Sequence, residues 1–324
     1  MITYKKLCQH PKAARSLIGM SVSAFDKLYV EFAEAHAQRL GQIKVTRRSK
    51  APRQRAVGAG RCHRYDLRDR LLMTLFWLRV YMTYEVMGFF YDLDKTNIED
   101  NLKDVLATLD TMTTFSYEHP QARQPKLRSP QAVMDAFPDV CLVIDAKEQR
   151  VQRPKNHRDD DGNVQDKQRP YYSGKKKTHT LKNQIAVRPD GFIEAVSESV
   201  PGGANHDIQL LRSTGLLGKL APDEAAMLDK GYAGIQKDYP DVCVYLPHKA
   251  RRNHPLTDEQ KAYNRHLARY RIVVEHTMAQ LNKFQVLAQV FRHQRDTHGQ
   301  LVRIVAALVN RRIQVVPLKT YAVA

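Results

Sequence analysis

The stretch Val140-Cys-Leu-Val-Ile144-Asp145 decides the fold class of this chain. Five consecutive apolar residues rich in β-branched side chains are typical of a buried strand, and the aspartate that follows marks its predicted carboxyl end. Further elements are predicted as strands at residues 178–187 and 192–200, a helix at 208–220, strands at 224–228 and 242–246, and a long helix from Thr257. This order predicts an α/β fold, a mixed sheet flanked by helices, over residues 130–324.

Residues 65–129 are predicted to form an all-helical domain instead. Dense apolar residues from Tyr65 to Tyr81 predict a buried helix, and a second helix over Thr83–Tyr91 ends at Asp92-Leu93. Asp94 is a plausible cap for a further helix. Helix, tight turn and helix are the layout of a helix-turn-helix, and a generic helical hairpin is the alternative. Against direct reading of a DNA groove, the last helix carries three acids, Glu99, Asp100 and Asp104.

The composition favours a polyanionic partner. The chain has 324 residues, with 52 Lys+Arg against 34 Asp+Glu, a formal net charge of +18. Nucleic acid and an anionic membrane surface both fit such a charge. The longest apolar stretch, Leu71–Phe90, is interrupted by Arg79 and Glu85, so no membrane span is predicted. Without a signal-like N-terminus or a C-x-x-C pair, a reducing cytoplasmic location is expected.

The basic arm between Lys44 and Arg64 carries much of the positive charge. It contains eight Lys or Arg and no acidic residue, together with Pro52, Gly58 and Gly60. We expect it to follow short amphipathic helices in a first region, residues 1–64, and to be flexible. Its predicted role is to neutralise DNA phosphates, and a solvated linker is the alternative. The residues expected to make these contacts are Arg47, Arg48 and Lys50.

Three acids occupy positions from which they can meet. Asp145 follows the first strand of the sheet, Asp229 ends the run Ala225–Leu228, and Glu275 lies in the long helix from Thr257. Singly, an acid at a strand end is usually a turn or cap residue, and Glu275 has a helical partner in Arg271 at i−4. However, strands in a parallel-containing sheet place functional groups at their carboxyl ends. Two such ends and one inward-facing helical glutamate would bring three carboxylates to one point.

Three converging carboxylates repel one another unless a cation neutralises them. Oxygen ligands of this kind select Mg²⁺ or Mn²⁺. Two such ions about 4 Å apart activate a water or a 3′-hydroxyl and stabilise the leaving oxygen of a phosphoryl transfer. Asp145, Asp229 and Glu275 are therefore the predicted catalytic and metal-binding residues.

These motifs together resemble the acid-triad (DDE) transposases. Asp145 after the first strand, Asp229-Lys-Gly-Tyr232 after a later one and Arg271-x-x-x-Glu275 in a helix are similar to the bacterial insertion-sequence five group and the related Harbinger-type endonucleases. The resemblance spans roughly residues 67–284. It implies a ribonuclease-H-like core, two divalent metals held by the three acids, and DNA as partner. By analogy, synapsis of two element ends implies a homodimer or a larger homo-oligomer.

The chain departs from the family pattern at a few positions. The Gly-Thr-Glu that follows the family's first acid is Ala146-Lys147-Glu148 here, so only the glutamate matches. The bacterial group's lysine seven residues after the last acid is replaced by Asn282. All three acids are present, so we expect activity.

Further DNA contacts are predicted in Tyr171-Tyr-Ser-Gly-Lys-Lys-Lys177, which resembles the family's motif at the entry of a strand. Lys175, Lys176 and Lys177 suit a phosphate track, and Tyr172 suits stacking on a base at a frayed end. A solvated basic hairpin is the alternative. Arg271 is expected to contact a DNA phosphate or to orient Glu275. Asp207, in a loop that resembles a family motif, is the rival of Asp229 as second acid.

The favoured function is a transposase that binds the terminal inverted repeats of its element and a target DNA, cuts the ends and transfers the strands. A catalytically inactive DNA-binding protein derived from a transposase is one alternative. A ribonuclease-H-like endonuclease that does not transpose is the other.

Overall fold

The computed structural model describes residues 2–46, 63–113, 139–158, 164–250, 252 and 254–315. The chain divides into two compact units. The first consists of Met1–Thr114 together with the short segment Lys283–Val286, and the second of Phe115–Asn282 and Leu287–Ala324. The helices of residues 1–64 and of residues 65–129 thus fall in the same unit. Our three-part division of the chain stays a prediction.

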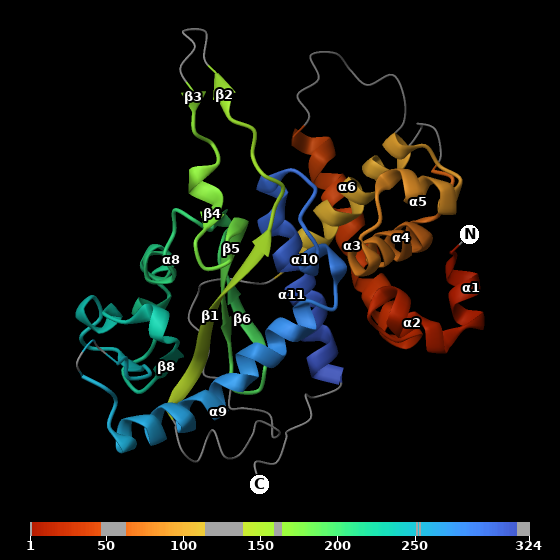
Figure 1. Ribbon diagram of the computed structural model, residues 1–324. Helices are drawn as coiled ribbons and strands as arrows, with labels where there is room; N and C mark the ends of the chain where they lie inside the picture. The colour runs from red at the N-terminus through yellow and green to blue at the C-terminus, as the bar shows by residue number, and fades with distance from the viewer. Residues whose placement is uncertain are drawn as a thin grey trace. The chain divides into compact units, whose positions relative to one another are not determined.

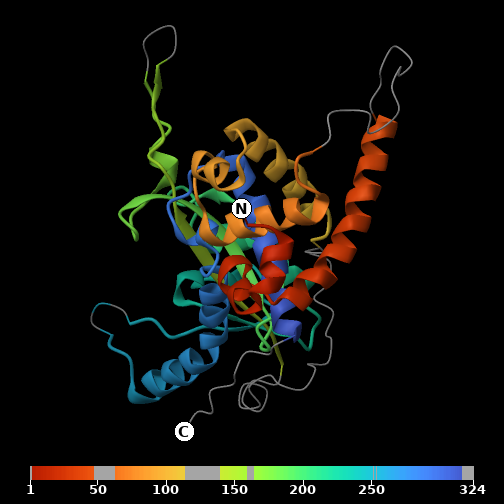
Figure 2. The same cartoon turned by 90° about the vertical axis from the view of Figure 1, so that its right-hand side faces the viewer.

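The described part of the first unit is helical. Its helices are α1 (Tyr4–Gln9), α2 (Pro11–Ile18), α3 (Val22–Thr46), α4 (Leu67–Val80), α5 (Tyr84–Tyr91) and α6 (Lys95–Thr111). Figure 2 shows α3 as one long helix without a break. The centre of the unit is α4, in which every residue from Arg70 to Leu78 is buried, as its dense apolar pattern predicts. Asp92 ends α5 in the left-handed conformation with φ 50°, which produces the predicted break before α6.

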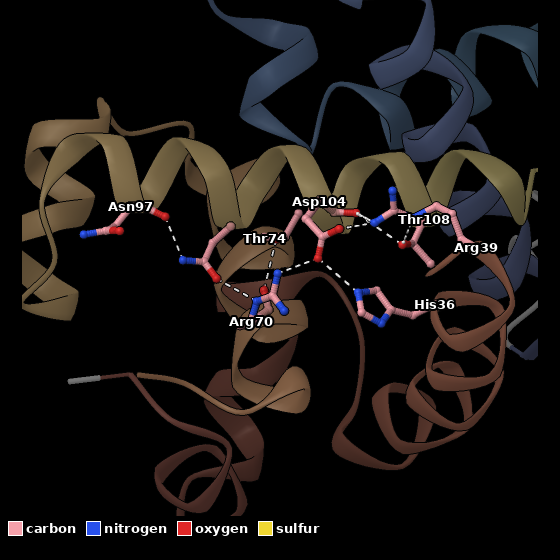
Figure 3. Close-up of polar contacts among 8 residues, drawn as sticks. His36, Arg39, Arg70, Thr74, Asn97, Asp104 and Thr108 are labelled. Atoms are coloured by element: carbon pink, nitrogen blue, oxygen red, sulfur yellow. Dashed lines mark hydrogen bonds and ion pairs between the residues drawn. The ribbon is translucent and has the colours of Figure 1, made fainter. Parts of the chain in front are cut away.

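Asp104 of α6 joins three helices of this unit. Its carboxylate accepts hydrogen bonds from Arg39 and His36 of α3 and from Arg70 of α4, the last at 2.5 Å (Figure 3). Burial alone would raise the pKa of Asp104, but the hydrogen bonds from His36 and Arg70 and the charges of the two arginines lower it. The aspartate is therefore a charged structural partner inside the unit.

The position of Asp104 weakens the objection that the acids of α6 would repel DNA. We expected Glu99, Asp100 and Asp104 to form one acidic face that repels DNA. Instead, Asp104 is turned into the unit, and Glu99 forms an ion pair with Lys103 at 2.7 Å. The acidic-face objection to DNA contact loses most of its force, and the helix-turn-helix stays a prediction.

The second unit is built around a mixed sheet (Figure 1). Its main path runs β4–β5–β1–β8–β9, with β6 and β7 both paired to β5. β1 pairs with β5 antiparallel and with β8 parallel, and β8 pairs with β9 parallel. A separate ribbon of two short strands extends from the sheet. The strands are β1 (Val140–Arg150), β2 (His157–Arg158), β3 (Val164–Gln165), β4 (Tyr172–Ser173), β5 (Thr178–Val187), β6 (Ile193–Val196), β7 (Val200–Pro201), β8 (Ala225–Leu228) and β9 (Cys243–Tyr245).

The helices α8 (Asp207–Thr214), α9 (Asp258–Leu281) and α11 (His298–Val315) pack against this sheet. The first two residues of the short helix α10 (Gln285–Ala288) belong to the first unit. The 3-10 turns of the second unit are η1 (Arg169–Tyr171), η2 (Leu216–Lys219), η3 (Lys230–Tyr232), η4 (Ile235–Lys237) and η5 (Arg295–Thr297). α9 begins at the predicted cap, where Thr257 and Gln260 form a capping box. The predicted α/β class, a mixed sheet flanked by helices, is confirmed. Within the described residues, no helix has the length and hydropathy of a membrane span.

The two faces of the sheet are set by the alternation of side chains along β1. Leu142 and Ile144 lie in an apolar cluster with Leu211 of α8, which we call the α8 side. Asp145 and Lys147 point to the opposite face, which we call the α9 side. Asp145 contacts Arg271 in the middle of α9, and Lys147 contacts Asn282, the residue that follows α9. The alternation therefore places the aspartate of β1 against α9.

Three predicted elements have wrong boundaries. The strand expected over residues 192–200 is divided into β6 and β7, and the helix expected over 208–220 ends as α8 at Thr214. We expected the first strand to end at Ile144, whereas β1 continues to Arg150. The parallel partner β8 does stop at Leu228, opposite Ile144, but antiparallel pairing with β5 goes on to Arg150 opposite Thr180. Pairing with a strand that lies far along the chain, and not a local apolar pattern, extends β1.

Candidate active site

Asp145 and Asp229 meet at the edge where β8 ends. Ile144 pairs in parallel with Leu228, the last residue of β8, so the next residue of each strand lies at the same level. Asp229 occupies the N-cap position of the 3-10 turn η3, but its side chain makes no capping hydrogen bond. The interpretation of Asp229 as an ordinary cap residue therefore fails, and its carboxylate is left for another partner.

That partner is Arg271 of α9, which bridges both aspartates. Its Nη1 lies 3.0 Å from Oδ1 of Asp229, and its Nη2 lies 3.7 Å from Oδ2 of Asp145. Asp145 also accepts a hydrogen bond of 2.8 Å from the backbone N–H of Ala146. The arginine side chain is 13% exposed, whereas the two aspartates are 29% and 32% exposed. The carboxylates thus stay open to solvent while their counter-ion is largely buried.

The electrostatics of Asp145 reflect this crowding. Burial raises the pKa of its carboxyl, and the negative charges of Asp229 and Asp207 raise it further. The backbone N–H of Ala146 and the charge of Arg271 act in the opposite direction without cancelling the shift. Additional positive charge beside this pair would therefore stabilise it.

Glu275 lies one helical turn after Arg271 but does not join the pair. Its neighbours Val273, Val274 and Thr277 take the buried positions of α9, and Glu275 is exposed rather than inward-facing as expected. The salt bridges of Arg271 go to the aspartates, so the predicted i−4 pairing with Glu275 is absent. Among the residues that the structure describes, no group of three His, Cys, Asp or Glu side chains is arranged to hold a metal ion. Two of the three predicted acids are therefore brought together.

A second carboxylate pair, which the sequence reasoning missed, lies on the α8 side. Lys182 of β5 contacts Asp207 at 2.8 Å and Glu148 of β1 at 3.5 Å, and it also donates to the backbone carbonyl of Asn205. Thr180 donates to the other oxygen of Glu148. The signal was the polar run Lys182-Asn-Gln184 inside a predicted strand, since buried polar side chains require partners. Asp207, the rival second acid, belongs to this group.

The predicted lysine track forms the turn between β4 and β5. Lys175, Lys176 and Lys177 are all exposed there, and Tyr172 is 48% exposed beside the ring of His179. Burial and the charge of Lys176 lower the pKa of Lys147 to about 8. The charge of Lys176 therefore acts on Lys147, which points to the same side of the sheet as Asp145.

Lys147 and Asn282, two residues at which the chain departs from the family pattern, contact each other. Lys147 stands where the family has threonine, and Asn282 stands where the bacterial group has lysine. Nζ of Lys147 lies 2.7 Å from Oδ1 of Asn282 and 3.0 Å from the carbonyl oxygen of Leu287. The chain therefore keeps one lysine at this junction, supplied from β1 and not from the end of α9.

The predicted contacts of the basic arm, Arg47, Arg48 and Lys50, fall outside the described residues. They stay predictions, as does the function of the arm.

Comparisons with known proteins identify the family of this chain. Residues 144–310, just over half of the chain, match the family described as DDE superfamily endonuclease. A protein of Microchaete diplosiphon, described as the probable transposase for insertion sequence element IS702, is 27% identical over 261 residues, covering 81% of this chain and 86% of that protein. No solved structure matches the chain. The matched region contains Asp145, Asp229 and Glu275, and the chain belongs to the DDE superfamily endonucleases.

Proposed function

We propose that this protein is a transposase that binds the ends of its element and carries out metal-dependent DNA cleavage and strand transfer. One observation carries the proposal. Asp145 and Asp229, 84 residues apart in the printed sequence, lie side by side at the end of β8 and share Arg271 as counter-ion. Asp145 within β1 and Asp229 directly after β8 stand at the same level of two parallel strands, an arrangement suited to metal-assisted phosphoryl transfer.

The two aspartates fit divalent cations. They offer hard oxygen donors, they are partly open to solvent, and their mutual repulsion already draws in a cationic side chain. We assign two Mg²⁺ or Mn²⁺ ions to this site, with Glu275 of α9 as the third acidic residue. When bound, such ions activate the attacking hydroxyl and stabilise the leaving oxygen. The protein places the carboxylates, and its positive side chains hold the DNA.

The DNA contacts follow the positive side chains on the α9 side. The exposed lysines of the β4–β5 turn would bind backbone phosphates, since their side chains are open to solvent, unlike the buried Lys182. Tyr172 would stack on an unpaired base. Arg47, Arg48 and Lys50 would add phosphate contacts from the basic arm.

We also propose that the second unit is a ribonuclease-H-like catalytic domain. The order β6–β5–β1–β8–β9, with the first three strands antiparallel and the last two parallel to β1, supports this. The helical first unit would contribute DNA binding. Pairing of two element ends would require a homodimer or a larger assembly, acting in the cytoplasm on chromosomal DNA.

Cleavage and joining assays test this function. The substrate is duplex DNA that carries the short inverted repeats flanking the coding gene, incubated with Mg²⁺ or Mn²⁺. We expect the wild-type protein to cut and then join these ends, and D145N to bind the same DNA without cutting it. Binding without cleavage by the wild type would favour the inactive DNA-binding protein. Cleavage without joining would favour a nuclease that does not transpose.

A further inference from the structure

We propose that Arg271 is a displaceable counter-ion, which leaves the two aspartates when divalent cations bind and thereby sets the affinity of the site for metal. The inference rests on the proposed function, because it takes Asp145 and Asp229 as metal ligands. It adds a role for Arg271 that is separate from contact with DNA or with Glu275.

The first support is the incomplete bonding of Arg271. An arginine that serves a fixed structural role usually presents two parallel N–H groups to one carboxylate. Here the guanidinium is divided between two carboxylates at unequal distances, 3.0 Å to Asp229 and 3.7 Å to Asp145. Its Nε is buried and has no hydrogen-bond partner among the described residues. The bridge is thus easier to give up than a fully bonded one.

The second support is space for the released side chain. A pocket of about 520 Å³ lies beside the pair and is lined in part by Asp229, Arg271, Lys230, His248 and Lys249. Arg271 forms one wall of this pocket, so its guanidinium can turn into it while α9 stays in place. Lys230 and Lys249 make the same pocket attractive to a DNA phosphate, which would then accept the hydrogen bonds of the arginine.

Electrostatic repulsion prevents a divalent ion and the guanidinium of Arg271 from contacting the two carboxylates at the same time. A divalent ion in contact with both carboxylates would lie within about 4 Å of a guanidinium that also contacts both, and like charges at that distance repel strongly in a partly buried site. Metal binding therefore has to break the arginine bridge. Removing the arginine should strengthen metal binding, whereas a residue that merely orients the ligands would weaken it when removed.

The test is Mn²⁺ titration of the DNA-free protein by isothermal calorimetry. We expect R271M to bind Mn²⁺ about fivefold more tightly than the wild type, the upper end of the value of one partly exposed ion pair. R271K keeps the positive charge and should stay within about threefold of the wild type. R269M, on the same helix, is the matched control because Arg269 is exposed and contacts neither aspartate. It should also stay within about twofold.

Weaker or unchanged Mn²⁺ binding by R271M would overturn the inference. If R271M fails to fold, R271Q replaces it and carries the same expectation. D145N separates this failure from failure of the proposed function. Loss of Mn²⁺ binding in D145N together with unchanged binding in R271M would refute the role of Arg271 alone. Wild-type Mn²⁺ binding in D145N would refute the metal assignment itself.

Discussion

The two carboxylate pairs of the second unit have the same charges and opposite characters. On the α9 side, Arg271 bridges Asp145 and Asp229, and its Nε has no hydrogen-bond partner in the part of the chain that the structure describes. On the α8 side, Lys182 donates hydrogen bonds to Asp207 and to the carbonyl of Asn205, and it forms an ion pair with Glu148 at 3.5 Å. The side chains of Lys182 and Glu148 are only 6% and 9% exposed, whereas Arg271 is 13% exposed. Asp207 is 27% exposed, close to the 29% and 32% of the aspartates on the α9 side, so the two groups differ in their cation and in Glu148.

The difference teaches how a structural ion pair can be told from a site that awaits a ligand. A buried charge must have all its hydrogen bonds made inside the protein, or the fold loses stability. The Lys182 group comes close to that requirement, since Lys182 has two hydrogen bonds and an ion pair and Thr180 donates to Glu148. The Arg271 group is further from it, because the buried Nε of Arg271 has no partner among the described residues and both of its acids are partly open to solvent. Incomplete bonding beside solvent-accessible carboxylates therefore marks the α9 side as the functional one.

The largest contrast is expected between D229N and D207N in the cleavage assay. D229N removes a proposed metal ligand, so cleavage should fall by about a thousandfold or more. D207N alters the structural group and should retain cleavage within about tenfold of the wild type, since Lys182 keeps its contacts with Glu148 and Asn205. A deeper loss in D207N than in D229N would reverse the assignment of the second acid.

We expect Lys182 to contribute more than Arg271 to the free energy of unfolding. K182M leaves Glu148 and Asp207 without their buried cation, and we expect the free energy of unfolding in urea to fall by about 3–5 kcal/mol. R271M, measured alongside in a chelator, should lose about 1 kcal/mol or less, because its partners can be solvated. Adding E148Q to K182M should recover part of the loss. Equal losses in K182M and R271M would erase the distinction between the two pairs.

The lysine turn allows a test of which side of the sheet faces DNA. Replacing Lys175, Lys176 and Lys177 with alanine should weaken binding to end DNA and flatten its dependence on salt, by up to about 3 in the slope of log K against log salt. K237A, in η4 on the α8 side, is the control and should leave the slope nearly unchanged. An equal or larger effect of K237A would place DNA on the wrong side for this account.

A fourth prediction concerns the lowest pH at which the protein stays folded. Any measurement of the two carboxylate pairs against pH depends on this limit. His298 is buried, bonded to Ser199 and Gln149, and burial lowers its pKa from 6.5 to about 3, with the charge of Lys147 adding to the shift. Between these values the unfolded chain binds a proton that the folded chain refuses. Stability should therefore fall as the pH drops from 6.5 towards 3, by at most about 1.4 kcal/mol per pH unit from this group.

The matched variant is H298Q, whose amide can keep a hydrogen bond without titrating. Its free energy of unfolding should change less steeply over this range than that of the wild type. Parallel curves for the two proteins would show that His298 does not set the acid limit.

Local patterns were enough to predict most of the sheet and the meeting of two acids. The apolar runs before Asp145 and Asp229 specified strands, and parallel pairing of Ile144 with Leu228 places the acid that follows each run at the same level of the sheet. The capping box at Thr257 specified the start of α9. These features depend on residues that are neighbours along the chain, so they can be predicted from the sequence.

The remainder depends on contacts between distant parts of the chain. β1 runs on to Arg150 because β5 supplies partners, although its last residues have no apolar pattern. The Lys182 group needs three separate segments to be brought together. The outward position of Glu275 follows from which residues of α9 the sheet buries, and no spacing in the helix alone fixes that.

The most direct test of the central claim is a crystal of the protein with its end DNA, soaked in Mn²⁺ and measured for anomalous scattering. We expect a peak within coordination distance of the carboxylates of Asp145 and Asp229, with Arg271 turned away from them. A peak between Glu148 and Asp207, or none at the Asp145–Asp229 pair when the DNA is bound there, would contradict the account.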